Sequence, residues 1–321
     1  MAPATLRVRV RAVADEAPDI RAFTLDSADG SALPPFTPGS HIDLRLAPGL
    51  TRQYSLCNGP DERTSYQIAV KKEPASRGGS RYMHESVRPG DVLEISAPKN
   101  NFALDDGSGP CLLVAGGIGI TPLLSMAKHL RAAGREFELL YFSRSIAQTA
   151  FHGLLSGAAF GARVSFHYAL EPDAVRAYLR RKLWQRPEGG QLYLCGPRPF
   201  MDLVEQTAAA TWPPQSVHLE YFAADPQASA GPRAGFVVRL ARSGICCDVA
   251  PEQTVVDALA ARGITVETSC EQGVCGTCLT GVLGGTPDHR DVFLTDEEKQ
   301  AGDKFCPCVS RARTAELVLD L

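Results

Sequence analysis

A chain of 321 residues is too long for one ordinary domain, and at about 100–150 residues per domain it should hold two or three. Its 44% hydrophobic and 21% charged residues exclude collagenous, coiled-coil and largely disordered chains. The net charge of −3 gives no bulk attraction to nucleic acid, and glycine and proline interrupt the longest apolar stretch, so we expect no nucleic-acid partner and no membrane segment. The chain lacks a secretory core, which favours a reducing, cytoplasmic setting where the ten cysteines stay thiols or bind metal.

The first 105 residues are predicted to form a β domain. Leu6, Val8 and Val10 alternate with arginines, which is the pattern of a strand with one buried face. Further short apolar runs follow between Gly, Pro and Asp turns, and regular short strands of this kind indicate a barrel or a sandwich. The predicted strands cover 6–10, 23–25, 41–46, 66–70 and 92–96.

Residues 106–224 show the pattern of alternating strands and helices. A continuous apolar run at 111–115 leads into a glycine turn, after which Thr121 is predicted as a helix N-cap and Pro122 as the first helical residue. Strands that alternate with helices imply a parallel sheet, so this segment is predicted to be an α/β domain. Later strands are expected at 137–142, 163–168 and 191–194, and helices up to 133 and at 150–156, 173–183 and 199–210.

The composition changes again after residue 224. Residues 225–235 are small and rich in Gly and Pro, without a periodic apolar face, and are predicted to be an interdomain linker. Residues 236–321 are predicted to form a separate C-terminal domain, which holds seven of the ten cysteines. From residue 233 onward nine Lys and Arg face thirteen Asp and Glu, so the acidic excess of the chain lies in this part.

The strongest motif is a group of cysteines spaced Cys-x4-Cys-x2-Cys, with a fourth cysteine after 29 intervening residues. This is the plant-type [2Fe–2S] arrangement, in which a short loop supplies three thiolates and a distant segment the fourth. Structural zinc is the alternative, but zinc sites usually combine two Cys-x2-Cys pairs. The predicted ligands are Cys270, Cys275, Cys278 and Cys308.

A second cysteine near the end of the motif leaves the identity of the fourth ligand open. Cys306 competes with Cys308 for the fourth position, and the spacing favours Cys308. Gly273 and Gly276 are expected to let the backbone approach the inorganic sulfides, where amide N–H groups raise the reduction potential. No Cys-x-His pair accompanies the motif in the sequence, so a Rieske centre within this chain is not expected.

The cysteine spacing, the sequence Cys308-Val-Ser-Arg-Ala and the segment 288–291 together resemble the ferredoxin domain of the phthalate dioxygenase reductase family. The resemblance implies a β-grasp fold for the C-terminal domain. Predicted strands at 236–241 and near Asp248, followed by a helix at 255–262, agree with that fold.

Two N-terminal motifs resemble the flavin barrel of ferredoxin–NADP reductase-like enzymes. An isoalloxazine ring needs an aromatic wall and polar donors, which 52–56 supplies. A phosphate group needs cations, hydroxyls and backbone N–H groups, which 77–81 supplies before a helical run. The resemblance implies FMN, with FAD as the alternative. The predicted flavin-binding residues are Arg52, Tyr54, Ser55, Leu56, Arg77, Gly79 and Ser80.

Two later segments resemble the nucleotide-binding segments of the same reductases. Glycines between a strand and a helix let a pyrophosphate approach the helix N-terminus. An arginine after the next strand is suited to a 2′-phosphate, yet the family preference implies NADH, with NADPH as the alternative. The predicted nucleotide-binding residues are Gly116, Gly117, Gly119, Thr121, Pro122, Ser143, Arg144, Cys195, Gly196 and Pro197.

Three residues are expected to act directly at the reacting rings. The resemblance implies that Cys195 lies beside the nicotinamide and that Phe222 closes over the flavin, with Tyr221 as the second candidate. Ser55 is expected to offer its hydroxyl to the flavin ring. Ordinary core packing is the alternative for Cys195 and for both aromatic residues.

Three carriers in one chain imply a line of electron transfer. A nicotinamide gives two electrons together and a [2Fe–2S] cluster accepts one, so a flavin must stand between them. The resemblance therefore implies a monomeric, NADH-dependent oxidoreductase that passes electrons from NADH through FMN and the cluster to the oxygenase component of a Rieske-type aromatic oxygenase. A reductase for a cytochrome P450 or a diiron hydroxylase, and a non-enzymatic iron–sulfur sensor or binding module, are the alternatives.

Overall fold

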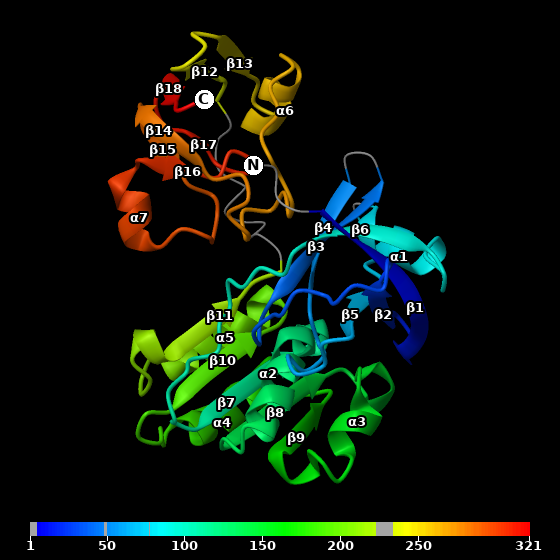
Figure 1. Ribbon diagram of the computed structural model, residues 1–321. Coiled ribbons are helices and arrows are strands. Elements are labelled where there is room, and N and C mark those ends of the chain that lie inside the picture. Colours follow the sequence, from blue (N-terminus) through cyan, green and yellow to red (C-terminus); the bar gives the residue numbers. More distant parts are fainter. Residues whose placement is uncertain (1–4, 48–49, 77, 223–233) are drawn as a thin grey trace. The chain divides into compact units, whose positions relative to one another are not determined.

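The structure is a computed structural model that describes residues 5–47, 50–76, 78–222 and 234–321 (Figure 1). The chain divides into two compact units, Met1–Glu220 and Tyr221–Leu321. Nearly all of the predicted linker at 225–235 lies outside the described residues. The domain limits drawn from the sequence, at 105, 224 and 235, stay predictions.

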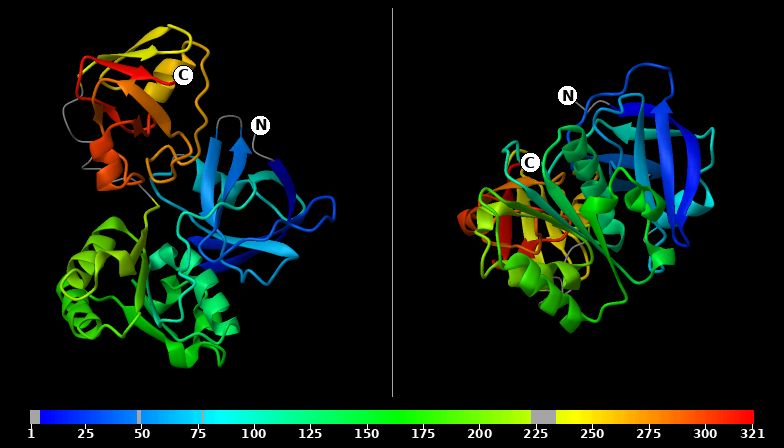
Figure 2. Two further views of the ribbon diagram at one scale, coloured as in Figure 1. Left: turned by 60° about the vertical axis from the view of Figure 1, so that its left-hand side comes forward. Right: turned by 90° about the horizontal axis from the view of Figure 1, so that it is seen from below.

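The first unit begins with a six-stranded antiparallel sheet in the order β4-β3-β6-β1-β2-β5. A bridge between Leu56, just after β4, and Ile68 of β5 joins the two edges, so the sheet closes into the barrel that was predicted. Figure 2 shows its blue strands curving around a common interior. The strands are β1 (Thr5–Ala17), β2 (Ile20–Ser27), β3 (His41–Ala47), β4 (Leu50–Ser55), β5 (Ser65–Lys71) and β6 (Val92–Ser96).

Strand β1 shows how the sequence pattern becomes structure. Val8 and Val10 are buried in the barrel interior, whereas Arg9 between them is exposed, as their alternation predicts. The strand is longer than predicted, because register shifts after Val10 let it stay paired with β2 as far as Ala17.

A five-stranded parallel sheet follows, in the order β11-β10-β7-β8-β9. The chain leaves β7 toward β8 and β9 on one side and returns to β10 and β11 on the other, so the topological switch point lies between β7 and β10. The strands are β7 (Cys111–Gly116), β8 (Phe137–Ser143), β9 (Val164–Tyr168), β10 (Gln191–Cys195) and β11 (Val217–Glu220).

Helices cover both faces of this parallel sheet. Leu113 on β7 shares a buried cluster with Leu123 of α2, on one face. On the other face, the ring of Phe142 in β8 contacts Tyr178 of α4 and Phe200 of α5. Two covered faces explain why β7 is apolar throughout. The helices of the first unit are α1 (Gly79–Glu85), α2 (Ile120–Ala132), α3 (His152–Ser156), α4 (Pro172–Leu183) and α5 (Arg198–Ala208).

The start of α2 corrects one prediction. A 3-10 turn at Gly117–Gly119 runs directly into α2, so Gly119 is the N-cap and Thr121 is the second helical residue. The Thr121 hydroxyl donates to the carbonyl of Ile118 at 3.1 Å instead of capping the helix. Pro122 lies in the first turn, where its missing N–H leaves no hydrogen bond unmade. The predicted N-cap was wrong because the glycine turn itself begins the helix.

The barrel and the parallel sheet share one interior. Ile20 and Ala22 of β2 and Ala69 of β5 belong to the same buried cluster as Leu113 of β7 and Leu123 of α2. Apolar burial of this kind stabilises the first unit as a whole.

The second unit is a mixed sheet in the order β13-β12-β18-β14-β16, with β12 and β18 parallel. Helix α6 packs beside β13 (Figure 1), which together with the mixed sheet confirms the predicted β-grasp fold. No helix within the described ranges is long and apolar enough to span a bilayer. The elements are β12 (Phe236–Leu240), β13 (Cys246–Val249), α6 (Val255–Ala260), β14 (Thr280–Gly284), β15 (Pro287–Asp288), α7 (Asp296–Ala301), β16 (Lys304–Phe305), β17 (Arg311–Ala312) and β18 (Glu316–Leu319).

Candidate functional site: a sheet crevice, a barrel edge and a cluster of cysteines

The carboxyl ends of β7 and β10 meet at the switch point. A Cβ atom added to Gly119 would lie 2.2 Å from the backbone oxygen of Cys195, and one added to Gly196 would lie 3.0 Å from Cα of Gly116. A Cβ on Gly116 would lie 3.0 Å from Cδ of Pro197. Only glycine allows backbones to approach this closely. The two predicted nucleotide-binding segments therefore lie together in the crevice where open α/β sheets bind nucleotides.

Hydrogen bonds hold the glycine turn in place. Gly117 has a φ of +54°, which favours glycine, and its carbonyl accepts a hydrogen bond of 3.1 Å from the Tyr141 hydroxyl. Thr121 and Pro122 are buried in the first turn of α2, directly after the turn. The turn and the start of the helix form one rigid edge of the crevice.

Ser143 and Arg144 follow the strand next to the glycine turn. The Ser143 hydroxyl lies 2.7 Å from Oγ1 of Thr149, which fixes its position at the end of β8. Arg144 is exposed immediately after it. In doubly wound sheets the residues after this neighbouring strand meet the ribose of a dinucleotide. Contact of either residue with a nucleotide stays a prediction.

The predicted phosphate-binding residues of the barrel are partly brought together. A Cβ on Gly79 would lie 2.5 Å from Cγ of Arg52, so the Arg52 side chain lies directly over the start of α1. The Ser80 hydroxyl lies 3.0 Å from Oγ of Ser76. Arg77 falls outside the described residues. The pairing of a guanidinium with a glycine backbone suits a phosphate group.

Tyr54 and Leu56 differ in how deeply they are buried in the barrel. Tyr54 is partly buried and packs against the barrel core, and burial raises the pKa of its phenol. Leu56 is fully buried, and its backbone N–H donates to the carbonyl of Ser40 at 2.8 Å. Flavin contacts of both residues stay predictions.

Glu220, the last residue of β11, was missed by sequence reasoning. It pairs in register with Cys195 of β10, and its carboxyl group is hydrogen-bonded to Ser55 at the end of β4. Other atoms of the residue reach solvent, but Oε2 is buried with no hydrogen-bond partner. Burial raises the pKa of Glu220 to about 8, against the hydrogen bond from Ser55, which lowers it. Burial and this carboxyl group together raise the pKa of the Cys195 thiol.

The arrangement joins the two halves of the first unit at three polar side chains. Ser55 comes from the barrel, whereas Cys195 and Glu220 come from the parallel sheet. The available signal for Glu220 was a single acid inside the mainly apolar and aromatic run 217–222. Only the structure shows that Ser55 lies against it.

The four predicted cluster ligands lie in two pairs. The thiol of Cys270 is hydrogen-bonded to that of Cys275, and the sulfur atoms of Cys278 and Cys308 are 3.3 Å apart. In the described part of the chain they do not form one group that would close on a single metal ion. A binuclear cluster takes two cysteines on each iron, so two pairs fit it better than they fit zinc.

Backbone N–H groups point at these sulfur atoms. Gln272 N lies 3.3 Å from Sγ of Cys270, and Thr277 N lies 3.4 Å from Sγ of Cys275. The N–H of Gly273 is hydrogen-bonded to the sulfur of Cys308. Such donors stabilise thiolates and tune the potential of an iron–sulfur cluster.

The two glycines of the loop are enclosed by neighbouring protein atoms, and their approach to the inorganic sulfides stays a prediction. Both have positive φ angles, +67° for Gly273 and +70° for Gly276. A Cβ on Gly276 would lie 2.2 Å from the ring of Phe293, and one on Gly273 would lie 2.9 Å from Cα of Asp291. Glycine is therefore required here because protein atoms fill the side-chain position.

Cys306 lies with the ligands but is fully buried. Its thiol, like that of Cys308, is hydrogen-bonded to Cys278, and these bonds lower the pKa of the Cys278 thiol to about 3. Cys278, Cys306 and Cys308 form one buried cluster. The choice of Cys308 as the fourth ligand stays a prediction.

The two aromatic residues after β11 belong to the second unit. The strand ends at Glu220, so Tyr221 and Phe222 lie beyond it. Phe222 is 40% exposed. Stacking of Phe222 on a flavin stays a prediction.

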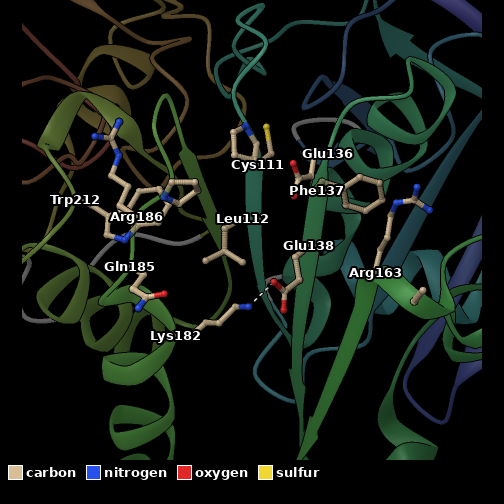
Figure 3. Close-up of a pocket in the computed structure, with 13 residues that line it drawn as sticks. Cys111, Leu112, Glu136, Phe137, Glu138, Arg163, Lys182, Gln185, Arg186 and Trp212 are labelled. Carbon is tan, nitrogen blue, oxygen red and sulfur yellow. Dashed lines mark hydrogen bonds and ion pairs between the residues drawn. The ribbon is translucent and has the colours of Figure 1, made fainter.

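A cavity of about 530 Å³ lies at the opposite edge of the parallel sheet, where β7 and β8 begin (Figure 3). Cys111, Phe137 and Trp212 line it, and an ion pair between Lys182 and Glu138 crosses its wall. None of the predicted site residues lines this cavity. The two predicted nucleotide-binding segments lie instead at the carboxyl ends of β7 and β10.

The fold and the site together define a modular oxidoreductase, in which a barrel and a nucleotide-type sheet precede an iron–sulfur domain. Residues 238–313 match the family described as the 2Fe-2S iron-sulfur cluster binding domain. This match covers the three-cysteine loop and Cys308 and confirms the predicted type of cluster.

Close relatives extend over the whole chain. The vanillate O-demethylase oxidoreductase of Pseudomonas sp. (strain HR199 / DSM 7063) is 47% identical over 98% of this chain and 100% of that protein. The phthalate dioxygenase reductase of Burkholderia cepacia is 40% identical over 98% of this chain and 97% of that protein. A solved phthalate dioxygenase reductase, described as a modular structure for electron transfer from pyridine nucleotides to [2Fe-2S], has a TM-score of 0.80 and 38% identity and covers 99% of this chain and 98% of its own. The chain belongs to the phthalate dioxygenase reductase family.

Proposed function

We propose that this protein is the reductase component of a Rieske-type aromatic oxygenase system, with NADH as electron donor, FMN and a [2Fe–2S] cluster as carriers, and a separate oxygenase polypeptide as acceptor. The relatives that share nearly its full length, named for vanillate and phthalate oxygenase systems, support this proposal. None of the ten cysteines, all of which lie in the described part of the chain, forms a disulfide, which supports a reducing, cytoplasmic setting. We further propose that it acts as a monomer.

The observation that carries the proposal is the meeting of barrel and sheet at Ser55, Cys195 and Glu220. A flavin accepts two electrons from a nicotinamide and passes them on singly, which is the chemistry that the chain must house. The glycines after β7 would bind and orient the nucleotide, and the guanidinium of Arg52, together with Gly79, would hold the flavin phosphate.

Ser55 and Glu220 control the protons at this junction. With a pKa of about 8, Glu220 keeps a proton on its carboxyl group at neutral pH. The protonated carboxyl adds no negative charge beside Cys195, and its proton can be donated through a hydrogen bond. Burial keeps the Cys195 thiol neutral, so it positions the nicotinamide by contact and does not act as a nucleophile.

In the second unit, Cys270 and Cys275 would hold one iron of the cluster, and Cys278 and Cys308 the other. Each pair is already gathered within the unit, with N–H groups directed at the sulfur atoms. The cluster when bound supplies one-electron transfer to the acceptor.

Anaerobic reduction of the purified holoprotein tests the proposal. Stoichiometric NADH is expected to bleach the flavin absorbance and then reduce the cluster, and NADPH is expected to react more slowly. Flavin released by acid should be FMN, accompanied by iron and labile sulfide. Electron delivery to a Rieske oxygenase, a cytochrome P450 and a diiron hydroxylase should be compared. Rapid turnover with the P450 or the hydroxylase but not with the Rieske oxygenase would refute the proposed partner. Failure of NADH to reduce the protein would refute the proposed reductase activity.

A further inference from the structure

The segment 288–294 contacts both parts of the chain that supply the cluster ligands. Val292 N–H donates to the carbonyl of Gly273, in the three-cysteine loop, at 3.0 Å. A Cβ on Gly273 would lie 2.9 Å from Cα of Asp291 and 2.6 Å from Cγ2 of Val309, which belongs to the Cys308 segment. Gly273 is therefore held tightly between Asp291 and the segment that carries the fourth ligand.

The carboxylate of Asp291 continues this connection. Its side chain has 0% exposure, and its Oδ1 accepts a hydrogen bond of 3.1 Å from the hydroxyl of Ser310. Ser310 is 1% exposed and comes two residues after Cys308. Its oxygen in turn accepts a hydrogen bond of 3.1 Å from the backbone N–H of Arg290. Asp291 and Ser310 thus bridge the segment 288–294 and the Cys308 segment.

Neutral donors stabilise the Asp291 carboxylate. Oδ2 accepts a hydrogen bond of 2.9 Å from Leu294 N, and Oδ1 accepts the one from Ser310. Nδ1 of His289 lies 3.6 Å from Oδ1, beyond ordinary hydrogen-bonding distance. The guanidinium of Arg290 is directed to Asp288, at 2.9 Å. Asp291 therefore places a buried negative charge against the backbone of the cluster loop.

A buried charge next to an iron–sulfur cluster affects its reduction potential. Reduction adds an electron to an already anionic cluster, and a fixed negative charge close by makes that step less favourable. Hydrogen bonds to the carboxylate withdraw part of its charge, so Ser310 weakens this effect. Removing the charge and removing the donor should therefore change the potential in different directions.

We propose that Asp291 is a positioning residue for the [2Fe–2S] cluster: through Ser310 it fixes the three-cysteine loop against the Cys308 segment, and its charge keeps the reduction potential of the cluster low. This inference rests on the proposed function, because it requires a cluster on the four predicted thiolates. It assigns a role to the segment 288–291, which the proposed function leaves without one.

Two variants of the full-length holoprotein separate the two effects. Asp291→Asn removes the charge and one acceptor, so the cluster potential should become more positive and cluster loss in the presence of a chelator should be several-fold faster. Ser310→Ala removes the bridge and keeps the charge, so cluster loss should again be several-fold faster while the potential does not rise. Asp248→Asn, an exposed acid on β13, is the matched control and should change neither quantity. The potential is measured by a redox titration followed by electron paramagnetic resonance.

The outcomes distinguish this inference from the proposed function. NADH-driven flavin reduction in each variant shows that the first unit is intact. A wild-type potential in Asp291→Asn, or an equal rise in Ser310→Ala or Asp248→Asn, would overturn the role of the charge. If Asp291→Asn is isolated without a cluster, Ser310→Ala provides the test of the positioning role. A wild-type rate of cluster loss in Ser310→Ala would then overturn the inference. Wild-type protein that lacks labile sulfide would overturn the proposed function and this inference with it.

Discussion

Replacing Glu220 by Gln tests the electrostatics of the junction between barrel and sheet. Glutamine has the shape of the protonated carboxyl group and can still accept a hydrogen bond from Ser55, but it cannot ionise. Any dependence of stability on pH that comes from Glu220 should therefore disappear in the variant, while the packing of β11 stays the same.

The size of the effect follows from the shift in pKa. Burial raises the pKa of Glu220 from 4.5 to about 8, so between these values the folded protein holds a proton that the unfolded chain releases. The contribution of Glu220 to the free energy of unfolding is fully present below the pKa that it has in the unfolded chain. It is lost as the pH rises through the pKa that it has in the folded protein. Each pH unit in this window costs about 1.4 kcal/mol. Between about pH 6 and pH 8 the wild type should lose about 2 kcal/mol more than Glu220→Gln, because ionisation of the folded protein begins near the upper limit.

Tryptophan fluorescence offers a suitable assay. The chain has two tryptophans, Trp184 and Trp212, and both lie in the first unit with Glu220. Trp212 is 3% exposed, so its emission should change when this unit unfolds. Urea unfolding of the flavin-free protein at a series of pH values gives the free energy of unfolding for each.

A matched control makes the result specific. Glu205→Gln is the same substitution at an exposed position of α5, and it should leave the pH dependence of the wild type unchanged. Parallel curves for wild type and Glu220→Gln across this pH range would refute the reasoning, because Glu220 would then ionise in the same way in the folded and unfolded states.

Three further predictions concern the nucleotide crevice and the cluster. Gly119→Ala should lower the free energy of unfolding by about 2–3 kcal/mol and abolish reduction by NADH, because its methyl group would lie 2.2 Å from a backbone oxygen at the end of β10. Gly153→Ala, in α3 with open space around it, should melt at or slightly above the wild-type temperature, and equal destabilisation of both variants would contradict the steric argument. Cys308→Ser should lose iron and labile sulfide while Cys306→Ser retains them, and the opposite result would make Cys306 the ligand. Arg144→Ala should leave kcat/KM for NADH within about threefold and lower that for NADPH by about tenfold, whereas equal losses would exclude a contact with the 2′-phosphate.

Local patterns made most of the fold predictable. Alternation around Val8 and Val10 identified a barrel strand, and the apolar run at 111–115 identified a strand buried on both faces. The cysteine spacing identified the iron–sulfur domain, because four thiolates at those intervals serve few other purposes. Each of these signals lies within a short stretch of sequence or in a fixed spacing.

The start of α2 was placed wrongly for a local reason as well. Threonine followed by proline is typical of a helix start, but Gly117–Gly119 already wind as a 3-10 turn and α2 begins at Ile120, one residue before Thr121. Propensity alone does not show that Gly119 adopts the N-cap position, because glycine fits both a turn and a cap.

Glu220 escaped prediction because its importance comes from contacts across the fold. Its partner Ser55 lies 165 positions earlier in the sequence, on a different sheet. The raised pKa comes from the burial of one carboxylate oxygen, which a sequence does not display. The same holds for Asp291, whose partners are known only once the cluster loop and the Cys308 segment are folded together.

The common interior of barrel and parallel sheet limits how this gene can be recombined. A fusion point near residue 105 would expose Ile20, Ala22 and Ala69 to solvent, and each fragment would carry an exposed apolar surface. A fusion point between Glu220 and Tyr221 instead follows the division of the chain into its two compact units. Chimeras that exchange the iron–sulfur domain should therefore be fused at that boundary. Exchange of the barrel alone would need a redesigned surface where the barrel packs on the parallel sheet.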